Sequence, residues 1–276
     1  MGAPLLRLVR GPNLVIAATG VLAGGWIAQR MIAVPKELVF AALSGIAIGA
    51  VGNTWNDMRD IAADRVNRPG TRPLAARHVT RGAADLIVFG GTLLAVAAAA
   101  LVSGRQVLAA IAALAVMFLY SPLLKPTPLV GNLAVAVVAG SPPFYGALAV
   151  WMPGAGVVPW VLGAWLHFVR EIVKDVEDEA GDRAIARRTL PIVAGRRPAL
   201  VVAAGAGLLF IPASLLLPLR AGYSGAYFVI ALLAQMAVLV AATWMLLGRV
   251  EGGRVSALLK IAMVIGLIAL VAGKVA

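Results

Sequence analysis

Long apolar stretches recur along the whole chain, and they constrain its fold more than any other feature. A helix needs about 20 mostly apolar residues to cross a bilayer. Nine stretches of roughly this length follow one another, at residues 12–33, 37–55, 83–103, 106–121, 129–151, 156–173, 198–218, 223–247 and 255–274. We therefore expect an all-α, polytopic membrane protein with about nine transmembrane helices in one domain over residues 1–276.

The composition supports a membrane protein and excludes several other classes. Hydrophobic residues make up 61% of the chain and charged residues only 13%, whereas soluble domains are about half apolar and about a quarter charged. Cys is absent and there are two His, so disulfides are excluded and a His-based metal site is disfavoured. The net charge of +12 then indicates basic cytoplasmic loops and not a nucleic-acid partner.

Basic residues also predict the orientation of the chain. With nine spans, the N-terminus and the loops after the even-numbered spans share one side, which holds eighteen Lys and Arg. The opposite side holds five. Because basic loops stay in the cytoplasm, we expect a cell-membrane protein whose N-terminus and charged loops are cytoplasmic. The first apolar run lacks a small-residue cleavage site, so we expect it to remain as a span.

Acidic residues are scarce and gather in two of these cytoplasmic loops. Nine of the twelve acids follow the second and the sixth span. Both loops repeat aspartates at positions i, i+3 and i+7, which on a helix fall within roughly 60° of one another. The two resulting stripes are Asp57, Asp60 and Asp64, and Asp175, Asp178 and Asp182.

Two stripes of carboxylates on one membrane face predict a divalent-cation site. Facing carboxylates repel each other unless a cation lies between them, and hard oxygen ligands suit Mg²⁺, with Mn²⁺ as an alternative. Neighbouring basic side chains suit the phosphates that Mg²⁺ often bridges. A solvated loop with compensating charges is the simpler reading, but ionisable groups at span ends are usually functional. The expected metal ligands are Asn56, Asp57, Asp60, Asp64, Asp175, Asp178 and Asp182.

A metal-bound diphosphate at this depth suggests an amphiphilic substrate whose tail stays in the bilayer, such as a prenyl diphosphate. The residues that carry this idea also resemble a known family. The chain is similar to the UbiA superfamily of intramembrane prenyltransferases in five motifs: Asn56, Asp60 and Asp64; Asn67, Arg68, Pro69, Arg72 and Pro73; Asp178 and Asp182; Tyr120 and Lys125; and Arg7, Arg10 and Asn13.

The resemblance implies nine helices around a central cavity that opens toward lipid, and Mg²⁺-dependent transfer of a prenyl group. It implies catalytic roles for Asp60, Asp64, Asp178 and Asp182. It also implies substrate-binding roles for Asn13, Asn56, Arg68, Arg72, Tyr120, Lys125 and Lys174.

One stretch points to a branch of the superfamily. REIVKDVEDEAGDRAIARRTLP, residues 170–191, resembles the members that add the second isoprenoid chain in archaeal ether-lipid synthesis. The expected reaction joins a geranylgeranyl group to the hydroxyl of geranylgeranylglyceryl phosphate. Arg183, Arg187 and Arg188 follow the second acidic stripe, and we expect one or more of them to bind the phosphate of this acceptor.

Two alternatives remain open from the sequence. The acceptor could be an aromatic ring, as in the 4-hydroxybenzoate prenyltransferases of the same superfamily. A divalent-cation transporter is a different class, but it requires charges near the bilayer midplane. The acids here lie at span ends on one side, with only Glu37 on the other. Partners are expected to be the prenyl diphosphate, the acceptor and membrane lipid.

Overall fold

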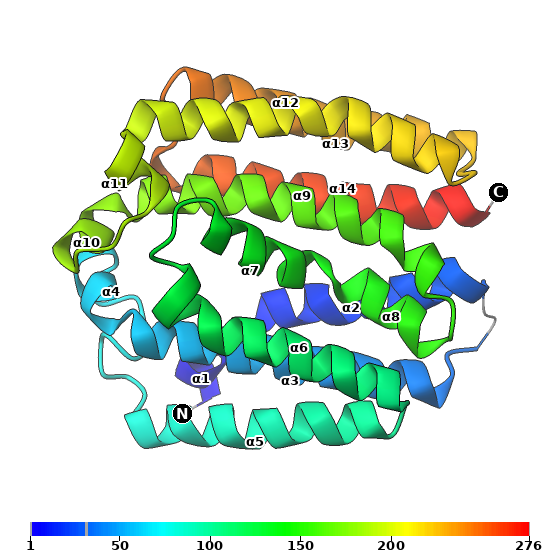
Figure 1. The fold of residues 1–276 in the computed structure, drawn as a ribbon, viewed down its shortest axis with the longest axis horizontal. Coiled ribbons are helices and arrows are strands. Elements are labelled where there is room, and N and C mark those ends of the chain that lie inside the picture. The colour runs from blue at the N-terminus through cyan, green and yellow to red at the C-terminus, as the bar shows by residue number, and fades with distance from the viewer. Residues whose placement is uncertain (1, 31–32, 276) are drawn as a thin grey trace.

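The computed structural model describes residues 2–30 and 33–275, and the regular elements in these two segments are all helical (Figure 1). Eight of the helices are long and apolar enough to cross a membrane. They are α2 (Gly11–Gln29), α3 (Lys36–Arg59), α5 (Arg81–Ala100), α6 (Gly104–Leu119, continued by the π-helical turn η1, Tyr120–Leu124), α9 (Pro153–Glu177), α12 (Arg196–Arg220), α13 (Gly225–Leu246) and α14 (Arg254–Val275, counted with the short η2, Glu251–Gly253).

A ninth span is formed by two shorter helices, α7 (Val130–Gly140) and α8 (Pro142–Ala149), which meet at an angle of 43°. Pro142 and Pro143 lack the backbone N–H that would continue α7, so α7 ends at Gly140 and α8 begins after Ser141. The prediction of about nine spans is therefore confirmed, and the fifth is a broken one.

Close helix contacts are made where glycine removes the side chain. A Cβ atom on Gly24 of α2 would lie 1.8 Å from the carbonyl oxygen of Pro143, and one on Gly146 of α8 would lie 1.8 Å from that of Val21. The backbones of α2 and α8 therefore touch, as is common in helix pairs within lipid. This contact holds the broken span against the first one.

The helices divide into two packed groups with separate cores. One buried cluster joins α9, α12, α13 and α14, a second joins α2, α3, α5 and α6, and a smaller third one lies between α1, α3 and α5. In Figure 1 the first group forms the upper layers and the second the lower layers, with α7 and α8 between them. The outer surface is apolar, with Leu86, Phe89 and Val229 each more than 60% exposed. Such a surface is stable against lipid tails.

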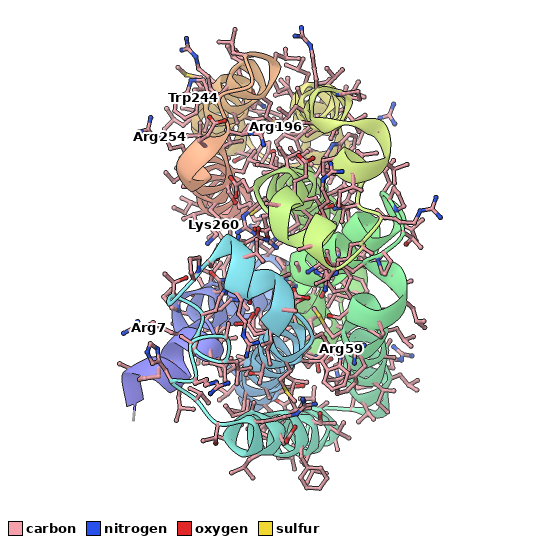
Figure 2. The ribbon with its side chains drawn as sticks, turned by 90° about the vertical axis from the view of Figure 1, so that its left-hand side faces the viewer. Arg7, Arg59, Arg196, Trp244, Arg254 and Lys260 are labelled. Carbon is pink, nitrogen blue, oxygen red and sulfur yellow. The ribbon has the colours of Figure 1, made fainter. Side chains whose placement is uncertain are left out.

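Four short helices lie at the ends of the spans. They are α1 (Gly2–Leu8), α4 (Ile61–Asn67), α10 (Glu179–Ala184) and α11 (Leu190–Ala194). In Figure 1, α4, α10 and α11 lie together at the left-hand end of the molecule, which faces the viewer in Figure 2. Both acidic loops are thus at one end of the helix bundle.

Candidate active site

Both aspartate motifs lie across the same kind of helix bend. Asp60 separates α3 from α4 with φ −98° and ψ 7°, and Asp178 separates α9 from α10 with φ −97° and ψ 5°. Backbone hydrogen bonds to the residue four positions earlier continue through each bend, from Asp60 to Asn56 and from Asp178 to Lys174. The expectation of straight helical stripes is therefore corrected: each stripe turns at its middle aspartate. The carboxylates stay on the inner side, and five of the six are buried.

Asp60 is held by two basic side chains from distant parts of the chain. Lys125 Nζ and the guanidinium of Arg187 each donate to a different carboxylate oxygen of Asp60. Burial alone would raise the pKa of Asp60, but Lys125 and Arg187 outweigh it and hold the pKa below its ordinary value. Asp60 is therefore ionised throughout the physiological range.

Lys125 reaches Asp60 because the chain makes a wide turn after α6. Pro122 has no N–H to donate, and the N–H of Lys125 bonds instead to the carbonyl oxygen of Tyr120, five residues earlier, at 2.7 Å. This π-type turn ends the span and directs the lysine side chain toward α3. Tyr120 itself is buried, as expected for a residue that lines the interior.

The negative charge of Asp64 is less well compensated by basic side chains than that of Asp60. Its nearest cations, Arg68 Nη1 and Arg72 Nε, both lie 3.6 Å away, beyond hydrogen-bonding distance. Burial is the largest influence and raises the pKa of Asp64 to about 6, helped by the negative charges of Asp57 and Asp60. Asp57 accepts a hydrogen bond from Arg10 at 2.7 Å. A carboxylate with a raised pKa and no direct partner is suited to accept a cation.

The second motif has fewer cations around it. Arg68 Nη2 donates to Asp178 at 2.6 Å, and Arg187 Nη1 donates to Asp182 at 2.8 Å. Burial raises the pKa of Asp182. Asp175 is held by a neutral group, the amide of Asn132, at 2.7 Å.

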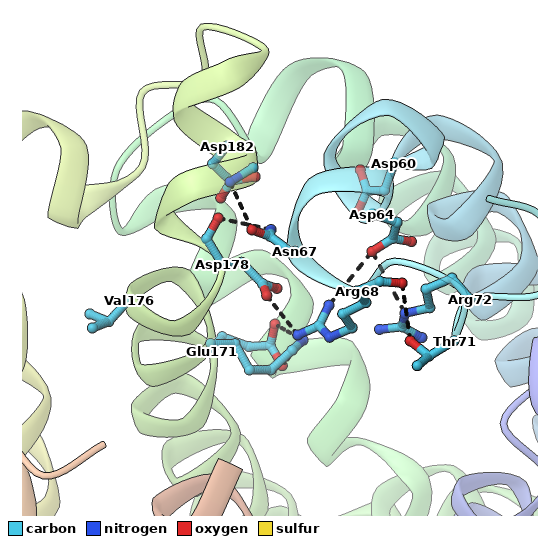
Figure 3. Close-up of polar contacts among 12 residues, drawn as sticks. Asp60, Asp64, Asn67, Arg68, Thr71, Arg72, Glu171, Val176, Asp178 and Asp182 are labelled. Carbon is cyan, nitrogen blue, oxygen red and sulfur yellow. Dashed lines mark hydrogen bonds and ion pairs between the residues drawn. The ribbon is translucent and has the colours of Figure 1, made fainter. Parts of the chain in front are cut away.

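The two motifs exchange their basic residues. Arg68 follows the first motif and pairs with Asp178 of the second, whereas Arg187 follows the second and pairs with Asp60 of the first. Figure 3 shows Arg68 between Asp64 and Asp178. These two arginines bring α4 and α10 together and neutralise acids that would otherwise repel each other.

Asn67 joins the same two helices through uncharged hydrogen bonds. Its amide nitrogen donates to the carbonyl oxygen of Asp178 at 2.9 Å, and its amide oxygen accepts from the N–H of Gly181 at 2.7 Å. A Cβ atom on Gly181 would lie 2.6 Å from the carbonyl oxygen of Ala63. Glycine at position 181 therefore allows α10 to approach α4 closely.

The residues of this site fit a divalent cation chemically, although charge pairs now separate them. Within residues 2–30 and 33–275, no three acidic or histidine side chains come near enough to hold one metal ion. One carboxylate oxygen of Asp182 is nevertheless buried with no hydrogen-bond partner in the described chain, and Asp64 has no direct one. Hard carboxylate oxygens without partners are what Mg²⁺ would bind.

The motifs lie at one end of a large cavity between the two helix groups. The cavity has a volume of about 660 Å³, and its walls away from the charged end are mainly apolar. It can hold a charged group against the aspartates and a hydrocarbon chain along the apolar helices. Twelve of the thirteen predicted metal- or substrate-binding residues line this cavity: Asn13, Asn56, Asp60, Asp64, Arg68, Arg72, Tyr120, Lys125, Lys174, Asp175, Asp178 and Asp182.

Two groups of predicted residues are placed differently from the rest. Asp57 is buried beside Arg10 and Arg72 and does not line the cavity. Among the arginines expected to bind an acceptor phosphate, Arg183 pairs with Glu179 at 2.7 Å on the surface, and Arg187 is taken up by the aspartates. The geometry thus gives these two arginines other partners.

Sequence reasoning missed Asn132 and Gly181 as parts of the site. It named Asn67 as part of a motif but gave it no role, and it gave Arg187 a different role. Asn132 was visible as the one amide in the apolar stretch PLVGNLAVAVV, residues 128–138. Polar side chains inside a span are costly and usually functional. The part played by Gly181 depends on the contact between α4 and α10, for which the sequence carries no signal.

A family model and several known relatives match the sequence. Residues 17–268 match the model of the UbiA prenyltransferase family. The chain is 35% identical to the digeranylgeranylglyceryl phosphate synthase of Methanopyrus kandleri, over 97% of both chains. It is 38% identical to the synthase of the same description from Thermococcus gammatolerans, over 81% of this chain and 80% of that one.

Solved structures share the fold. A structure described as digeranylgeranylglyceryl phosphate synthase in membranes aligns with a TM-score of 0.77 at 24% identity, over 99% of this chain and 98% of that one. A UbiA homologue from Archaeoglobus fulgidus, solved with DMAPP and Mg²⁺, aligns with a TM-score of 0.72 at 19% identity, over 97% and 99% of the two chains.

Proposed function

The chain belongs to the UbiA prenyltransferase family, and we propose that it transfers the geranylgeranyl group of geranylgeranyl diphosphate to the hydroxyl of geranylgeranylglyceryl phosphate. The product carries the second ether bond of an archaeal-type membrane lipid. The observation that carries this proposal is the cavity, in which two aspartate motifs meet an apolar interior. The similarity to synthases of this description over most of the chain supports the choice of acceptor.

Mg²⁺ is the proposed cofactor, with Mn²⁺ as a substitute of similar ligand preference. Asp60, Asp64, Asp178 and Asp182 would hold it, since all four line the charged end of the cavity. When bound, the cation would neutralise charge on the leaving diphosphate. Asn56 donates to Asp60 at 3.0 Å and so orients that carboxylate.

Basic residues at the same end are proposed to hold the diphosphate. Lys125, Arg68 and Arg72 line the cavity beside the aspartates. Each now pairs with a carboxylate. A diphosphate offers them oxygens of the same geometry, and arginine binds such groups through two parallel hydrogen bonds.

The remaining residues exclude water and guide the transfer. The allylic carbon–oxygen bond of the donor breaks with its electron pair on the diphosphate, and the acceptor hydroxyl oxygen forms the new bond to that carbon. The hydroxyl proton leaves to the diphosphate or to solvent. Apolar walls such as Ile48, Leu162 and Leu166 keep water from the electron-poor carbon. The ring of Tyr120 lines the cavity, where its face can stabilise positive charge.

The orientation remains part of the proposal. The protein is multi-pass, with both acidic loops at one end. The excess of basic residues at this end supports a cytoplasmic N-terminus and a cytoplasmic active site in the cell membrane. A path for cations across the bilayer is not supported, because the carboxylates of the site gather at that single end.

An acceptor screen tests the proposed reaction. Purified protein in lipid, with Mg²⁺ and radiolabelled geranylgeranyl diphosphate, is offered geranylgeranylglyceryl phosphate or 4-hydroxybenzoate. We expect a labelled ether lipid that is lost with EDTA and with Asp60→Asn. A labelled arene instead would move the function to an aromatic acceptor. If neither product forms, the proposed reaction is wrong.

A further inference from the structure

A second cavity of about 590 Å³ adjoins the active site, and its walls are strongly basic. We call it the cationic pocket. It is formed where α1, α2, α9, α14 and the loop after α4 meet. Its basic wall residues are Arg7, Arg10, Arg68, Arg72, Arg170, Lys174 and Lys260, and among the described residues that line it Glu177 is the only acid.

The aspartates of the active site do not line this pocket. Asp60, Asp64, Asp178 and Asp182 belong to the larger cavity alone. The two cavities nevertheless share walls, among them Arg10, Arg68, Arg72, Arg170, Lys174 and Lys260. An anion in the pocket would therefore lie beside the metal-binding end without competing for its carboxylates.

The positive charge of the pocket is only partly neutralised by the protein. Lys174 and Arg170 both depend on Glu171, at 2.7 Å and 3.5 Å. Lys260 forms no ion pair or side-chain hydrogen bond with any residue in the described parts of the chain. Figure 2 shows Lys260 where α14 approaches the N-terminal half of the molecule. Placing a charged lysine at such a helix junction costs free energy unless an anion pairs with it.

Buried hydrogen-bond donors without a partner also indicate that the pocket binds an anion. The Nε atoms of Arg10 and Arg170 are buried and have no hydrogen-bond partner among the described residues. Arg10 uses one of its terminal nitrogens for Asp57, and Arg170 approaches Glu171 only at 3.5 Å. Buried donors in native proteins are normally satisfied. The geometry therefore leaves N–H groups from the turn between α1 and α2 and from α9 for a ligand with several acceptor oxygens.

We infer that the cationic pocket binds the phosphate monoester of the lipid acceptor, and that Arg170 and Lys260 determine specificity for a phosphorylated acceptor. This inference rests on the proposed function. A phosphate monoester carries close to two negative charges and three acceptor oxygens near neutral pH. Bound in the pocket, it leaves the acceptor's hydrocarbon chain free to enter the apolar cavity through the shared wall.

This assignment separates the two anionic substrates. The donor diphosphate is held at the aspartate end by Lys125, Arg68 and Arg72, beside the proposed metal ligands. The acceptor phosphate is held next to it by Arg170 and Lys260, at a site without carboxylate ligands for Mg²⁺. Arg10, Arg68 and Arg72 stand between the two anions and screen their repulsion.

Steady-state kinetics test the inference. Arg170→Met and Lys260→Met are compared with the wild type and with Arg254→Gln, which removes a charge from α14 at an exposed position outside the pocket. We expect the KM for geranylgeranylglyceryl phosphate to rise about 10- to 100-fold in both pocket variants. The KM for geranylgeranyl diphosphate should change less than twofold, and Arg254→Gln should behave as the wild type. An unchanged acceptor KM, or a larger rise in the donor KM, would overturn the inference.

Binding without turnover separates this inference from the proposed reaction. Calorimetry in lipid nanodiscs with EDTA compares geranylgeranylglyceryl phosphate with the same lipid lacking its phosphate. We expect the wild type to bind the phosphorylated lipid at least tenfold more tightly, and Lys260→Met to lose this preference. Equal binding of both lipids by the wild type would overturn the inference even if a variant failed to fold. Phosphate-dependent binding without transfer would support the pocket and reject the proposed reaction.

Inorganic phosphate distinguishes the lipid headgroup from a free anion. At the concentration of the lipid it should not compete, because it gains nothing from the apolar cavity. Competition at equal concentration would assign the pocket to free phosphate and overturn the inference.

Discussion

The two aspartate motifs have the same spacing and the same helix bend, but they differ in the charges that surround them. In the first motif, Asp57 and Asp60 each contact basic side chains directly. In the second, Asp175 has only the neutral amide of Asn132, and Asp182 shares Arg187 with Asp60. One oxygen of Asp182 is buried without a hydrogen-bond partner among the described residues. A repeated sequence pattern thus does not imply equal electrostatics.

This comparison shows which carboxylates of the site are already neutralised by basic side chains of the protein. Arg187 lies between the motifs and contacts both Asp60 and Asp182. Its positive charge offsets the repulsion between these two carboxylates while no substrate is bound. Asp57 and Asp60 of the first motif are neutralised by the protein itself. Asp64, together with Asp175 and Asp182 of the second motif, keeps capacity for a further cation. Substitutions in the two motifs can therefore be compared position by position.

The largest effect is expected at the two middle aspartates. Asp60→Asn and Asp178→Asn should each lower kcat/KM by roughly 10³-fold, because each removes negative charge from a site that stabilises a leaving group electrostatically. Initial rates of prenyl transfer measure this. Glu179→Gln is the matched control, since Glu179 pairs with Arg183 and lies outside the cavity. An Asp178 variant that kept a tenth of the activity would show that only the first motif is needed.

Arg187 and Arg68, which each pair with an aspartate of the other motif, are expected to differ in their effect on stability. Arg187→Met should lower the free energy of unfolding by about 3 kcal/mol, because it leaves the buried Asp182 without its basic partner and Asp60 with Lys125 alone. Arg68→Met should cost about 1 kcal/mol or less, since the pair of Arg68 with Asp178 is partly exposed to solvent. Thermal unfolding in detergent with EDTA compares them.

Repeating the thermal unfolding with added Mg²⁺ tests the role of Arg187 directly. If Arg187 stands in for a cation, Mg²⁺ should raise the Tm of Arg187→Met more than that of the wild type. Equal shifts would contradict the idea that Arg187 shields the two aspartates from each other.

The next largest effect on the free energy of unfolding is expected at the contact between α4 and α10. Gly181→Ala should cost about 2 kcal/mol, since its Cβ would meet backbone at Ala63 and force α10 away from α4. Gly205→Ala in α12 is the control, because a Cβ there meets nothing within 4 Å. A lower Tm for both variants alike would assign the loss to general helix effects and not to this contact.

Much of the fold could be predicted from the sequence because the bilayer fixes the length of each span. The nine apolar stretches and the charged end required no knowledge of packing. The bend between α7 and α8 was not predicted, although Pro142 and Pro143 mark it. An apolar stretch long enough to span gives the same signal whether its helix is straight or broken.

The candidate site was predictable as a set of residues but not as a set of pairs. Asp60, Asp64, Asp178 and Asp182 were expected from their spacing, and all four line the cavity. The pair of Arg187 with Asp60 joins residues 127 positions apart. It depends on how two helix bends meet, which no local pattern encodes. Consequently, the sequence assigned Arg187 to a substrate phosphate, whereas its partners are carboxylates.

The smallest expected effect concerns the pH dependence of Asp64. Its pKa is raised from 3.8 to about 6, mainly by burial, so the fold disfavours its ionised form. The protonated carboxyl contributes stability that is fully present below about pH 4 and is lost as the pH rises through about 6. Asp64→Asn keeps a neutral side chain at every pH. The variant should therefore unfold less readily than the wild type at pH 8, by about 1 kcal/mol.

That figure is a fraction of the roughly 3 kcal/mol that two pKa units represent, because solvent at this end of the cavity screens the charge. Thermal unfolding with EDTA between pH 4 and pH 8 measures it, and the difference between variant and wild type should vanish at pH 4. The same variant should lose prenyl-transfer activity at pH 8. A stability gain together with lost activity would mean that the ionised Asp64 is kept for a cation at the expense of the empty fold. A variant less stable than the wild type at pH 8 would instead assign Asp64 to the arginines around it.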